Sequence, residues 1–218
     1  MSKFELIIFD CDGVLIDSEF LAGRVQAEVK TEMGFPITIE EQIRRFTGHG
    51  FKSTIVQEEL KLLPPHYFET MEERQWEIFK SELKPISYIH STLEAISLPK
   101  CVASSSSLKR LQYTLGLVDL AQYFIECIFS VSLVSRGKPF PDIFLYAAKK
   151  MGVSPDKCLV IEDSEAGVRA AKSAGMTVFG FTGGSHMSPE LINRLKDVGS
   201  HLIFSCMSEL PKLINSYF

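Results

Sequence analysis

Acidic residues gather directly behind an apolar run near the start of the chain. The stretch IIFDCDGVLIDSE (7–19) places Asp10, Asp12 and Asp17 just after the run 6–9. Like charges at the mouth of a buried strand repel one another and raise the free-energy cost of folding. A bound cation would remove that repulsion, and carboxylates without histidine or thiolate partners favour a hard ion, most simply Mg²⁺. The stretch is therefore a candidate metal site.

Three other apolar runs also end in polar side chains that could do chemistry. Ser104 follows CVA, Lys138 lies in the loop SRGKPFPD after the third run, and Glu162 and Asp163 follow CLVI. Any one of these could be an ordinary turn, a solvated lysine or the start of a helix. In a parallel sheet, however, the carboxyl ends of the strands share one rim, so we expect these residues and the acids of the first run to form a single site.

The chemistry that such a site permits is phosphoryl transfer. One carboxylate can attack a phosphoryl group held by the metal, which gives an aspartyl-phosphate. A second carboxylate can protonate the leaving oxygen and later deprotonate water. Lys138 and the hydroxyl of Ser104 would neutralise and orient the phosphoryl oxygens. A calcium-binding EF-hand loop is excluded, because its template needs glycine at Leu15 and an oxygen ligand at Val14.

Short strand-like runs alternate with segments of helical periodicity through most of the chain. Continuous apolar strands that alternate with helices predict an α/β fold, a Rossmann-like, doubly wound parallel sheet. The six predicted strands are 4–9, 100–104, 126–131, 157–162, 176–181 and 201–205.

One segment interrupts this alternation with helical patterns alone. Thr38 and Glu41 have the spacing of a capping box, and the segment 69–83 has the apolar spacing of an amphipathic helix. We therefore predict a helical cap domain, residues 18–85, inserted after strand 1 of a catalytic core made of residues 1–17 and 86–218. The two crossings between them, near 16–19 and 84–88, are candidate hinges.

Composition narrows the classes of partner. A formal net charge of −4 gives no basic surface for nucleic acid or an anionic membrane, and no apolar run is long enough to span a bilayer. The five cysteines show no C-x-x-C spacing, which indicates reduced thiols and not disulfides or a zinc site. Without a signal-peptide pattern, we expect a cytoplasmic protein, a monomer, acting on a small phosphorylated metabolite.

These motifs resemble those of the haloacid dehalogenase-like (HAD) hydrolase superfamily, and the resemblance covers essentially the whole chain. FDCDGVLIDSE is similar to its first motif, VASSS to its second, GKPFPDIF to its third and IEDSEAGVRAAKSAG to its fourth. The helical insert is similar to the cap of the branch that contains β-phosphoglucomutase and many sugar-phosphate phosphatases. Four ordered motifs are a far more specific signal than any one of them.

The resemblance implies a role for each motif residue. Asp10 would be the nucleophile and a metal ligand, and Asp12 the general acid/base, with its backbone carbonyl on the metal. Asp163 would complete the Mg²⁺ site and Glu162 would act through water, while the second-motif serine and the third-motif lysine would hold the phosphoryl group. An acid at position 12 implies a phosphate monoester substrate, because carbon–halogen and carbon–phosphorus cleavage do not need a protonated phosphoester leaving group.

The expected function is that of an Mg²⁺-dependent phosphatase acting on a sugar phosphate or a small phosphorylated acid. The first alternative is a phosphosugar mutase, whose cap loop would need cations for a distal phosphate. Thr47 and Phe51 occupy the corresponding places here, although Lys52 could substitute, and Ala22 stands where those mutases have a histidine. His49 and Lys52 are the candidate specificity residues of the cap loop.

A second alternative, from a different class, is a non-catalytic protein on the same fold that binds a phosphosugar or a protein partner. That interpretation predicts the loss of at least one motif residue, and none is missing. His186, in the loop after the fifth predicted strand, is a further candidate for the core side of the entrance.

Overall fold

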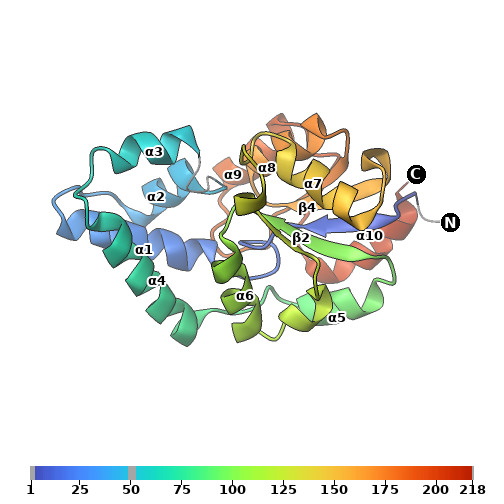
Figure 1. Ribbon diagram of the computed structural model, residues 1–218, viewed down its shortest axis with the longest axis horizontal. Helices are drawn as coiled ribbons and strands as arrows, with labels where there is room; N and C mark the ends of the chain where they lie inside the picture. The colour runs from blue at the N-terminus through green and yellow to red at the C-terminus, as the bar shows by residue number, and fades with distance from the viewer. Residues whose placement is uncertain (1–2, 49–52, 218) are drawn as a thin grey trace.

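The core of the molecule is one parallel sheet of six strands (Figure 1). The structure, a computed structural model, describes residues 3–48 and 53–217. In spatial order the strands are β3 (Ile128–Ser130), β2 (Lys100–Ser104), β1 (Leu6–Phe9), β4 (Cys158–Glu162), β5 (Thr177–Phe181) and β6 (Leu202–Phe204). Every neighbouring pair is parallel, and each strand lies within the run that predicted it. The predicted α/β fold class is confirmed.

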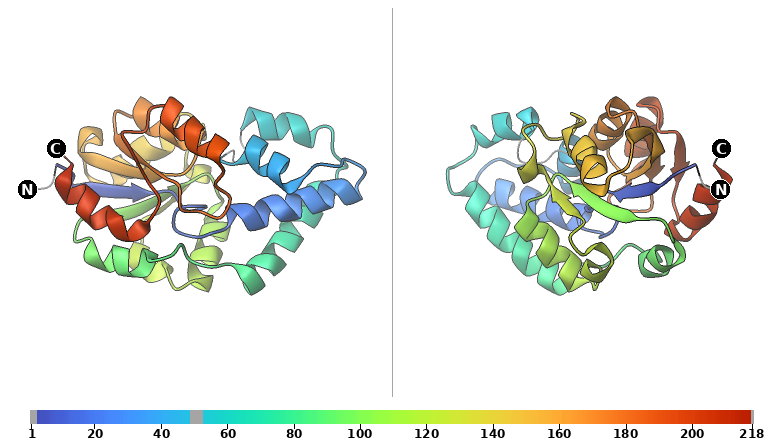
Figure 2. Two further views of the ribbon diagram at one scale, coloured as in Figure 1. Left: turned by 180° about the vertical axis from the view of Figure 1, so that it is seen from behind. Right: turned by 45° about the vertical axis from the view of Figure 1, so that its right-hand side comes forward.

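Helices cover both faces of the sheet, which is why its strands are apolar at consecutive positions. Ile7 and Phe9 of β1 face one core, whereas Leu6 and Ile8 face the other. The first face is covered by α5 (Ile89–Ala95), α6 (Leu108–Leu117) and α10 (Leu210–Ser216), and the second by α7 (Asp142–Met151), α8 (Glu165–Ser173) and α9 (Pro189–Asp197) (Figure 2). Short 3₁₀ turns lie at Ala121–Phe124, Val131–Leu133, Pro155–Lys157 and Met207–Glu209.

The segment predicted as the cap contains four helices and, among its described residues, no strand of the sheet. They are α1 (Glu19–Glu32), α2 (Ile39–Phe46), α3 (Thr54–Leu60) and α4 (Tyr67–Glu82). The Thr38 side chain accepts a hydrogen bond from the backbone N–H of Glu41 at 3.1 Å, so Thr38 is the N-cap residue of α2, as the sequence predicts. These helices stand at the end of the molecule opposite both chain termini (Figure 1). They face the end of the sheet that carries the polar motif residues.

The two crossings between cap and core lie side by side. The backbone N–H of Asp17 donates to the carbonyl of Lys84 at 2.9 Å, and the N–H of Ile86 donates to the carbonyl of Leu15 at 3.0 Å. A bridge between Ile16 and Pro85 lies between these two bonds. Both crossings therefore leave the core at one place, as a hinge between two parts requires.

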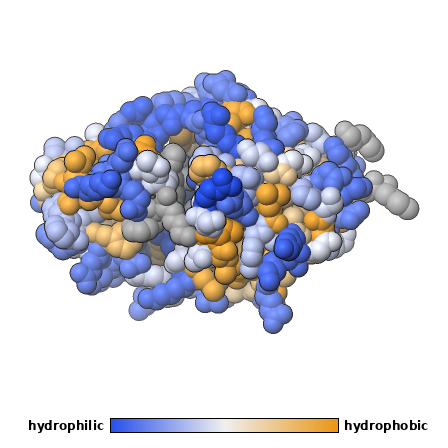
Figure 3. Space-filling model, turned by 45° about the horizontal axis from the view of Figure 1, so that its top comes forward, coloured by the Kyte–Doolittle hydropathy of each residue, from blue (hydrophilic) through white to orange (hydrophobic). Residues whose placement is uncertain are grey.

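The predictions on cysteines and on membrane-spanning segments can be compared with the structure directly. All five cysteines are free thiols, and Cys11, Cys101 and Cys158 are buried. Among the described residues, no helix combines the length and the apolar character needed to cross a bilayer. Figure 3 shows one face of the molecule, where hydrophilic side chains cover most of the surface and hydrophobic ones lie in separate groups.

Candidate active site

A buried ion-pair network joins the first strand to two distant segments. Lys138, from the loop between β3 and α7, donates to Asp10 Oδ1 at 2.7 Å and to Glu162 Oε1 at 2.5 Å. All three side chains are nearly or fully buried. Asp10 follows β1, and Glu162 is the last residue of β4, so the parallel sheet brings both to the rim where Lys138 arrives. The structure thus brings these three predicted residues together.

A third carboxylate completes an acidic cluster. Asp10, Glu162 and Asp163 each offer an oxygen within 4.8 Å of the others. Asp163 Oδ2 is buried and accepts no hydrogen bond of adequate geometry among the described residues, although His186 Nε2 lies 3.1 Å away. A Cβ added at Gly13, where φ is +76°, would lie only 1.8 Å from that oxygen, so glycine is what gives the carboxylate its space. A cluster of oxygen donors with one unsatisfied buried carboxylate oxygen fits a hard divalent cation.

Glu162 differs from the other two acids in how its oxygens are used. Its Oε1 accepts from Lys138, while its Oε2 accepts from the backbone N–H groups of Asp163 and Ser164, both at 3.1 Å, and from the Ser164 hydroxyl at 3.0 Å. Ser164 in turn caps α8 by accepting from the N–H of Gly167. Glu162 therefore positions the lysine and the start of α8, and it has little capacity left for direct metal binding.

The electrostatics of the cluster favour an added cation. Burial raises the pKa of Asp10 well above its usual value; Lys138 opposes this rise, and the charges of Glu162 and Asp163 add to it. Burial and then Glu162 likewise raise the pKa of Asp163. Burial would lower the pKa of Lys138, but Asp10 and Glu162 outweigh it and raise the value. Three carboxylates against one ammonium leave a negative excess that a divalent ion would neutralise.

Asp12 is turned away from that cluster toward the cap. Its Oδ1 accepts from the Ser18 hydroxyl at 2.6 Å and lies 3.3 Å from an Arg110 nitrogen, while Oδ2 accepts from the Ser106 hydroxyl at 2.7 Å. Burial acts to raise the pKa of this carboxyl, but the Arg110 charge and the two serine hydroxyls outweigh it and lower the value. The two aspartates of the D-x-D pair therefore occupy different environments.

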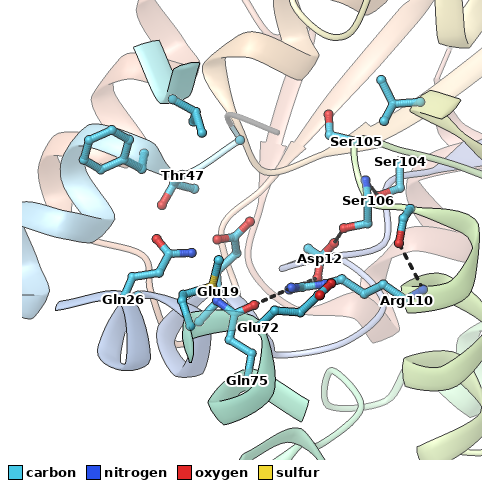
Figure 4. Close-up of a pocket in the computed structure, with 18 of the residues that line it drawn as sticks. Asp12, Glu19, Gln26, Thr47, Glu72, Gln75, Ser104, Ser105, Ser106 and Arg110 are labelled. Carbon is cyan, nitrogen blue, oxygen red and sulfur yellow. Dashed lines mark hydrogen bonds and ion pairs between the residues drawn. The ribbon is translucent and has the colours of Figure 1, made fainter. Parts of the chain in front are cut away.

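Cap and core enclose a cavity of about 430 Å³ above these residues (Figure 4). Its core side includes Asp10, Asp12, Ser104 and Lys138. Ser104 is buried, and its hydroxyl accepts from the N–H of Ser106, which holds the loop after β2 against the cavity. Gly48 brings the two parts together, because a Cβ added there would lie 2.3 Å from that of Ser164. The cap side includes Glu19, Gln26, Gln42, Glu59, Glu72 and Gln75.

The remaining residues that the sequence analysis named differ in where they lie relative to the cavity. His49 and Lys52, the predicted cap-loop contacts, lie outside the described residues. Thr47 and Ala22 do line the cavity. His186 is buried behind Asp163, with Nε2 3.1 Å from its Oδ2, and burial lowers the histidine pKa. It does not line the cavity, so it contacts the acidic cluster and not the substrate side.

Arg110 is the most prominent residue that sequence reasoning missed. One guanidinium nitrogen donates to Gln75 Oε1 at 2.6 Å, and the group lies 4.8 Å from the Phe79 ring centre, so α4 of the cap holds it beside Asp12 (Figure 4). A signal was present in the sequence. Lys109 and Arg110 fall in the first turn of the helix capped by Ser107, where the helix dipole favours acids.

Glu19, at the start of α1, was also missed. Burial raises its pKa to about 8, with the charges of Asp12 and Asp163 adding to the effect and His186 and Arg110 opposing it. Its side chain lines the cavity between cap and core (Figure 4). It can accept or donate a hydrogen bond near neutral pH, which suits contact with hydroxyl groups.

Comparison with known proteins identifies the family of the chain. The family model of haloacid dehalogenase-like hydrolases matches residues 4–175. The chain is 31% identical over 217 residues to 6-phosphogluconate phosphatase of Escherichia coli K12, with 98% of this chain and 96% of that protein covered. It is 31% identical over 196 residues to β-phosphoglucomutase of Bacillus subtilis 168, with 83% and 84% covered. A solved haloacid dehalogenase-like protein of unknown function from Agrobacterium tumefaciens C58 superposes with a TM-score of 0.87 at 40% identity, with 98% of each chain covered.

Proposed function

Because the chain belongs to the haloacid dehalogenase-like hydrolases, we propose that it is an Mg²⁺-dependent phosphatase of a small phosphate monoester. The observation that carries the proposal is the Asp10 carboxylate, held by Lys138 at 2.7 Å within the acidic cluster and at the floor of a cavity. A nucleophile, a fixed cation and room for a leaving group are the parts that phosphoryl transfer needs.

The first step is attack of an Asp10 oxygen on phosphorus. The new bond joins phosphorus to the carboxylate oxygen, and the bond to the leaving-group oxygen breaks, which gives an aspartyl-phosphate. Lys138 and the Ser104 hydroxyl hold the phosphoryl oxygens as their charge shifts. Lys138 is already fixed by Asp10 and Glu162, so it needs no rearrangement at the moment of reaction.

Asp12 serves both steps as acid and then base. Arg110 and the serine hydroxyls keep Asp12 ionised in the free protein, so it must first take up a proton, which the negative charge of a bound phosphate ester favours by raising the pKa of the carboxyl beside it. It gives this proton to the departing oxygen, and afterwards takes one from the water that attacks the phosphorus of the aspartyl-phosphate. The hydroxyls of Ser18 and Ser106 and the Arg110 guanidinium fix its carboxylate on the leaving-group side. This orientation separates it from the nucleophile two residues earlier.

Asp10 and Asp163 would hold the cation directly, with the backbone carbonyl of Asp12, and Glu162 would act through water. When bound, Mg²⁺ supplies positive charge that offsets the charge of the phosphoryl oxygens and of the carboxylates around it. Glu162 is assigned the indirect place because its two oxygens already accept from Lys138, two backbone N–H groups and a hydroxyl.

A phosphosugar mutase is the second candidate, favoured by the similarity to β-phosphoglucomutase. A mutase must bind a doubly phosphorylated intermediate, so its cap must attract a distal phosphate. Among the described residues, the cap side of the cavity carries Glu19, Glu59 and Glu72 and no lysine or arginine. These acids favour a hydrolase. A non-catalytic binding protein is less well supported, because every motif residue is present.

The test is release of phosphate from phenyl phosphate, 6-phosphogluconate and glucose 6-phosphate, with Mg²⁺ and with EDTA. Turnover with Mg²⁺ that EDTA abolishes is the expected result. Conversion of β-glucose 1-phosphate to glucose 6-phosphate without phosphate release would identify a mutase instead. No turnover of any ester by folded, Mg²⁺-loaded protein would overturn the proposal in favour of a binding protein.

A further inference from the structure

A chain of buried hydrogen bonds crosses the cap and ends at the cavity. Lys30 of α1 is 2% exposed, and its ammonium donates to Gln42 Oε1 and to Glu59 Oε2, each at 2.6 Å. Gln42 of α2 is equally buried, and its Nε2 donates to Gln26 Oε1 at 2.5 Å. The same ammonium lies 4.3 Å from the Phe46 ring centre. These hydrogen bonds therefore link three cap helices through one buried cation.

The direction of this chain is fixed by the chemistry of its first member. An ammonium has three donors and no acceptor, so Gln42 must present its oxygen to Lys30 and its nitrogen to the far side. That nitrogen can only donate, so Gln26 must accept with its own oxygen. The Gln26 amide is thereby locked with its Nε2 pointing onward. A reversed Gln42 amide would place two sets of donors against each other in a buried place.

Gln26 is the end of the chain, and it lies at the substrate cavity. Its side chain is half-buried, lines the cavity, and is directed into the space between cap and core (Figure 4). Its Nε2 donates to none of the described residues. The cap thus presents an oriented amide donor that has no partner within residues 3–48 and 53–217. A ligand atom that accepts a hydrogen bond is the natural partner.

We propose that Gln26 is a specificity-determining residue that donates a hydrogen bond to a hydroxyl oxygen of a polyhydroxylated leaving group. This inference rests on the proposed phosphatase function and names the part of the substrate that the cap recognises. Lys30, acting through Gln42, imposes the orientation of the Gln26 amide. A lysine that touches no substrate therefore determines that the cap presents a donor and not an acceptor to the cavity.

The neighbouring acids select a hydroxyl over a second anion as the acceptor. Glu19, Glu59 and Glu72 also line the cavity, and their carboxyl groups can accept from a hydroxyl. Among the described cap residues no lysine or arginine lines the cavity to bind a second phosphate, and the buried Lys30 behind it is already paired with Glu59 at 2.6 Å. A sugar hydroxyl can accept from Gln26 and donate to one of these acids at the same time. Only a group that is both donor and acceptor satisfies both kinds of neighbour.

The experiment compares two classes of ester in variants of Gln26. Gln26→Glu keeps an oxygen for the Gln42 amide but replaces the donor with an acceptor, and Gln26→Leu removes both. The ratio of kcat/KM for the best hydrolysed sugar ester, among glucose 6-phosphate, fructose 1-phosphate and 6-phosphogluconate, to kcat/KM for phenyl phosphate is measured. Loss of one hydrogen bond predicts a fall of about tenfold in this ratio, carried mainly by KM.

Two further variants separate recognition from stability. Lys30→Met frees the Gln42 and Gln26 amides to turn and should lower the same ratio, whereas Gln112→Leu, on the exposed face of α6, should not. Melting temperatures identify any variant that is misfolded. An unchanged ratio in folded Gln26→Glu and Gln26→Leu would overturn the inference. So would a wild-type enzyme that prefers phenyl phosphate to every sugar ester, a result that leaves the phosphatase proposal intact.

Discussion

The floor and the roof of the cavity are built on different principles. The floor, Asp10, Lys138, Glu162 and Asp163, stands on strand ends and one loop, and its charges are crowded, buried and paired at short distances. The roof, Gln26 and Glu59 with the buried Lys30–Gln42 pair behind them, stands on cap helices and presents amides and a carboxylate. The floor is suited to phosphoryl transfer, whereas the roof is suited to recognising the leaving group.

The difference shows in what each region leaves unsatisfied. On the floor, a buried Asp163 oxygen accepts no hydrogen bond among the described residues, and the three carboxylates exceed the one ammonium in charge. Both features favour binding of a cation. In the roof, the Gln26 amide donor has no partner in the part of the chain that the structure describes, and a neutral hydrogen-bond acceptor would satisfy it. Since the two needs differ, changes in the floor should affect all esters equally, and changes in the roof should discriminate among them. This contrast yields three predictions for the floor and one for Asp12, which lines the cavity on the leaving-group side and is not part of the floor as defined here.

The largest effect is expected for Asp10→Asn. An amide is a far poorer nucleophile than a carboxylate, so turnover of every ester should fall by more than about 10⁴-fold. The fold should persist, because the change removes one of three crowded acids. Phosphate release and circular dichroism measure the two quantities. A variant that fails to fold would show that Asp10 is needed for structure and would break the proposed division between floor and roof.

Asp12→Ala should slow hydrolysis by about 10²–10⁴-fold, the usual range for a lost general acid/base. The loss should be smaller for esters with acidic leaving groups, which need less protonation, so 4-nitrophenyl phosphate should suffer less than glucose 6-phosphate. Mg²⁺ affinity, measured by calorimetry, should be retained because the proposed ligand at this position is a backbone carbonyl. Full activity would remove the acid/base assignment.

Lys138→Met should reduce kcat/KM by about 10²–10³-fold, the cost of losing one fixed donor to the phosphoryl oxygens. It should also destabilise the apo protein by about 3–5 kcal/mol, because Glu162 is left buried without its cation. Urea unfolding gives the second quantity. Lys150→Met, on the exposed end of α7, is the matched control and should change neither. A stable, active Lys138→Met protein would contradict the ion-pair argument.

The smallest effect is a pH-dependent gain in stability from Mg²⁺. The pKa values of Asp10 and Asp163 are raised by folding, so without metal their ionisation costs stability as pH rises above the ordinary value of 3.8. A bound cation favours the ionised forms and reverses this cost. The Mg²⁺-induced stabilisation, measured as a rise in melting temperature at pH 5 and at pH 8, should therefore grow as pH rises above 3.8 toward the raised pKa values. The growth is at most about 1.4 kcal/mol per pH unit for each proton that Mg²⁺ binding displaces.

The control for this titration is Asp163→Asn, which removes one proposed ligand and the unsatisfied oxygen together. In this variant the Mg²⁺ shift should be small at every pH. A wild-type shift that is the same at pH 5 and pH 8 would mean that the acidic cluster is not where the ion binds.

The sequence by itself determined the strands and the convergence of the motif residues. Continuous apolar runs such as 158–161, short and alternating with helical segments, predict strands covered on both sides, and parallel strands place their carboxyl ends on one rim. From that rule alone Asp10, Lys138 and Asp163 were expected at one place, where the structure has them. Local periodicity and a general rule of topology carry this information.

Only the tertiary structure decided what the cap contributes. Arg110 meets Asp12 because Gln75, far along the chain, holds it, and Gln26 is oriented because Lys30 lies buried under Gln42. No local pattern records these contacts: they depend on how amphipathic helices pack against one another and against the core, and many side chains fit the same periodicity. Backbone patterns fix where elements lie, whereas the partners of a half-buried polar side chain are settled only when distant surfaces meet.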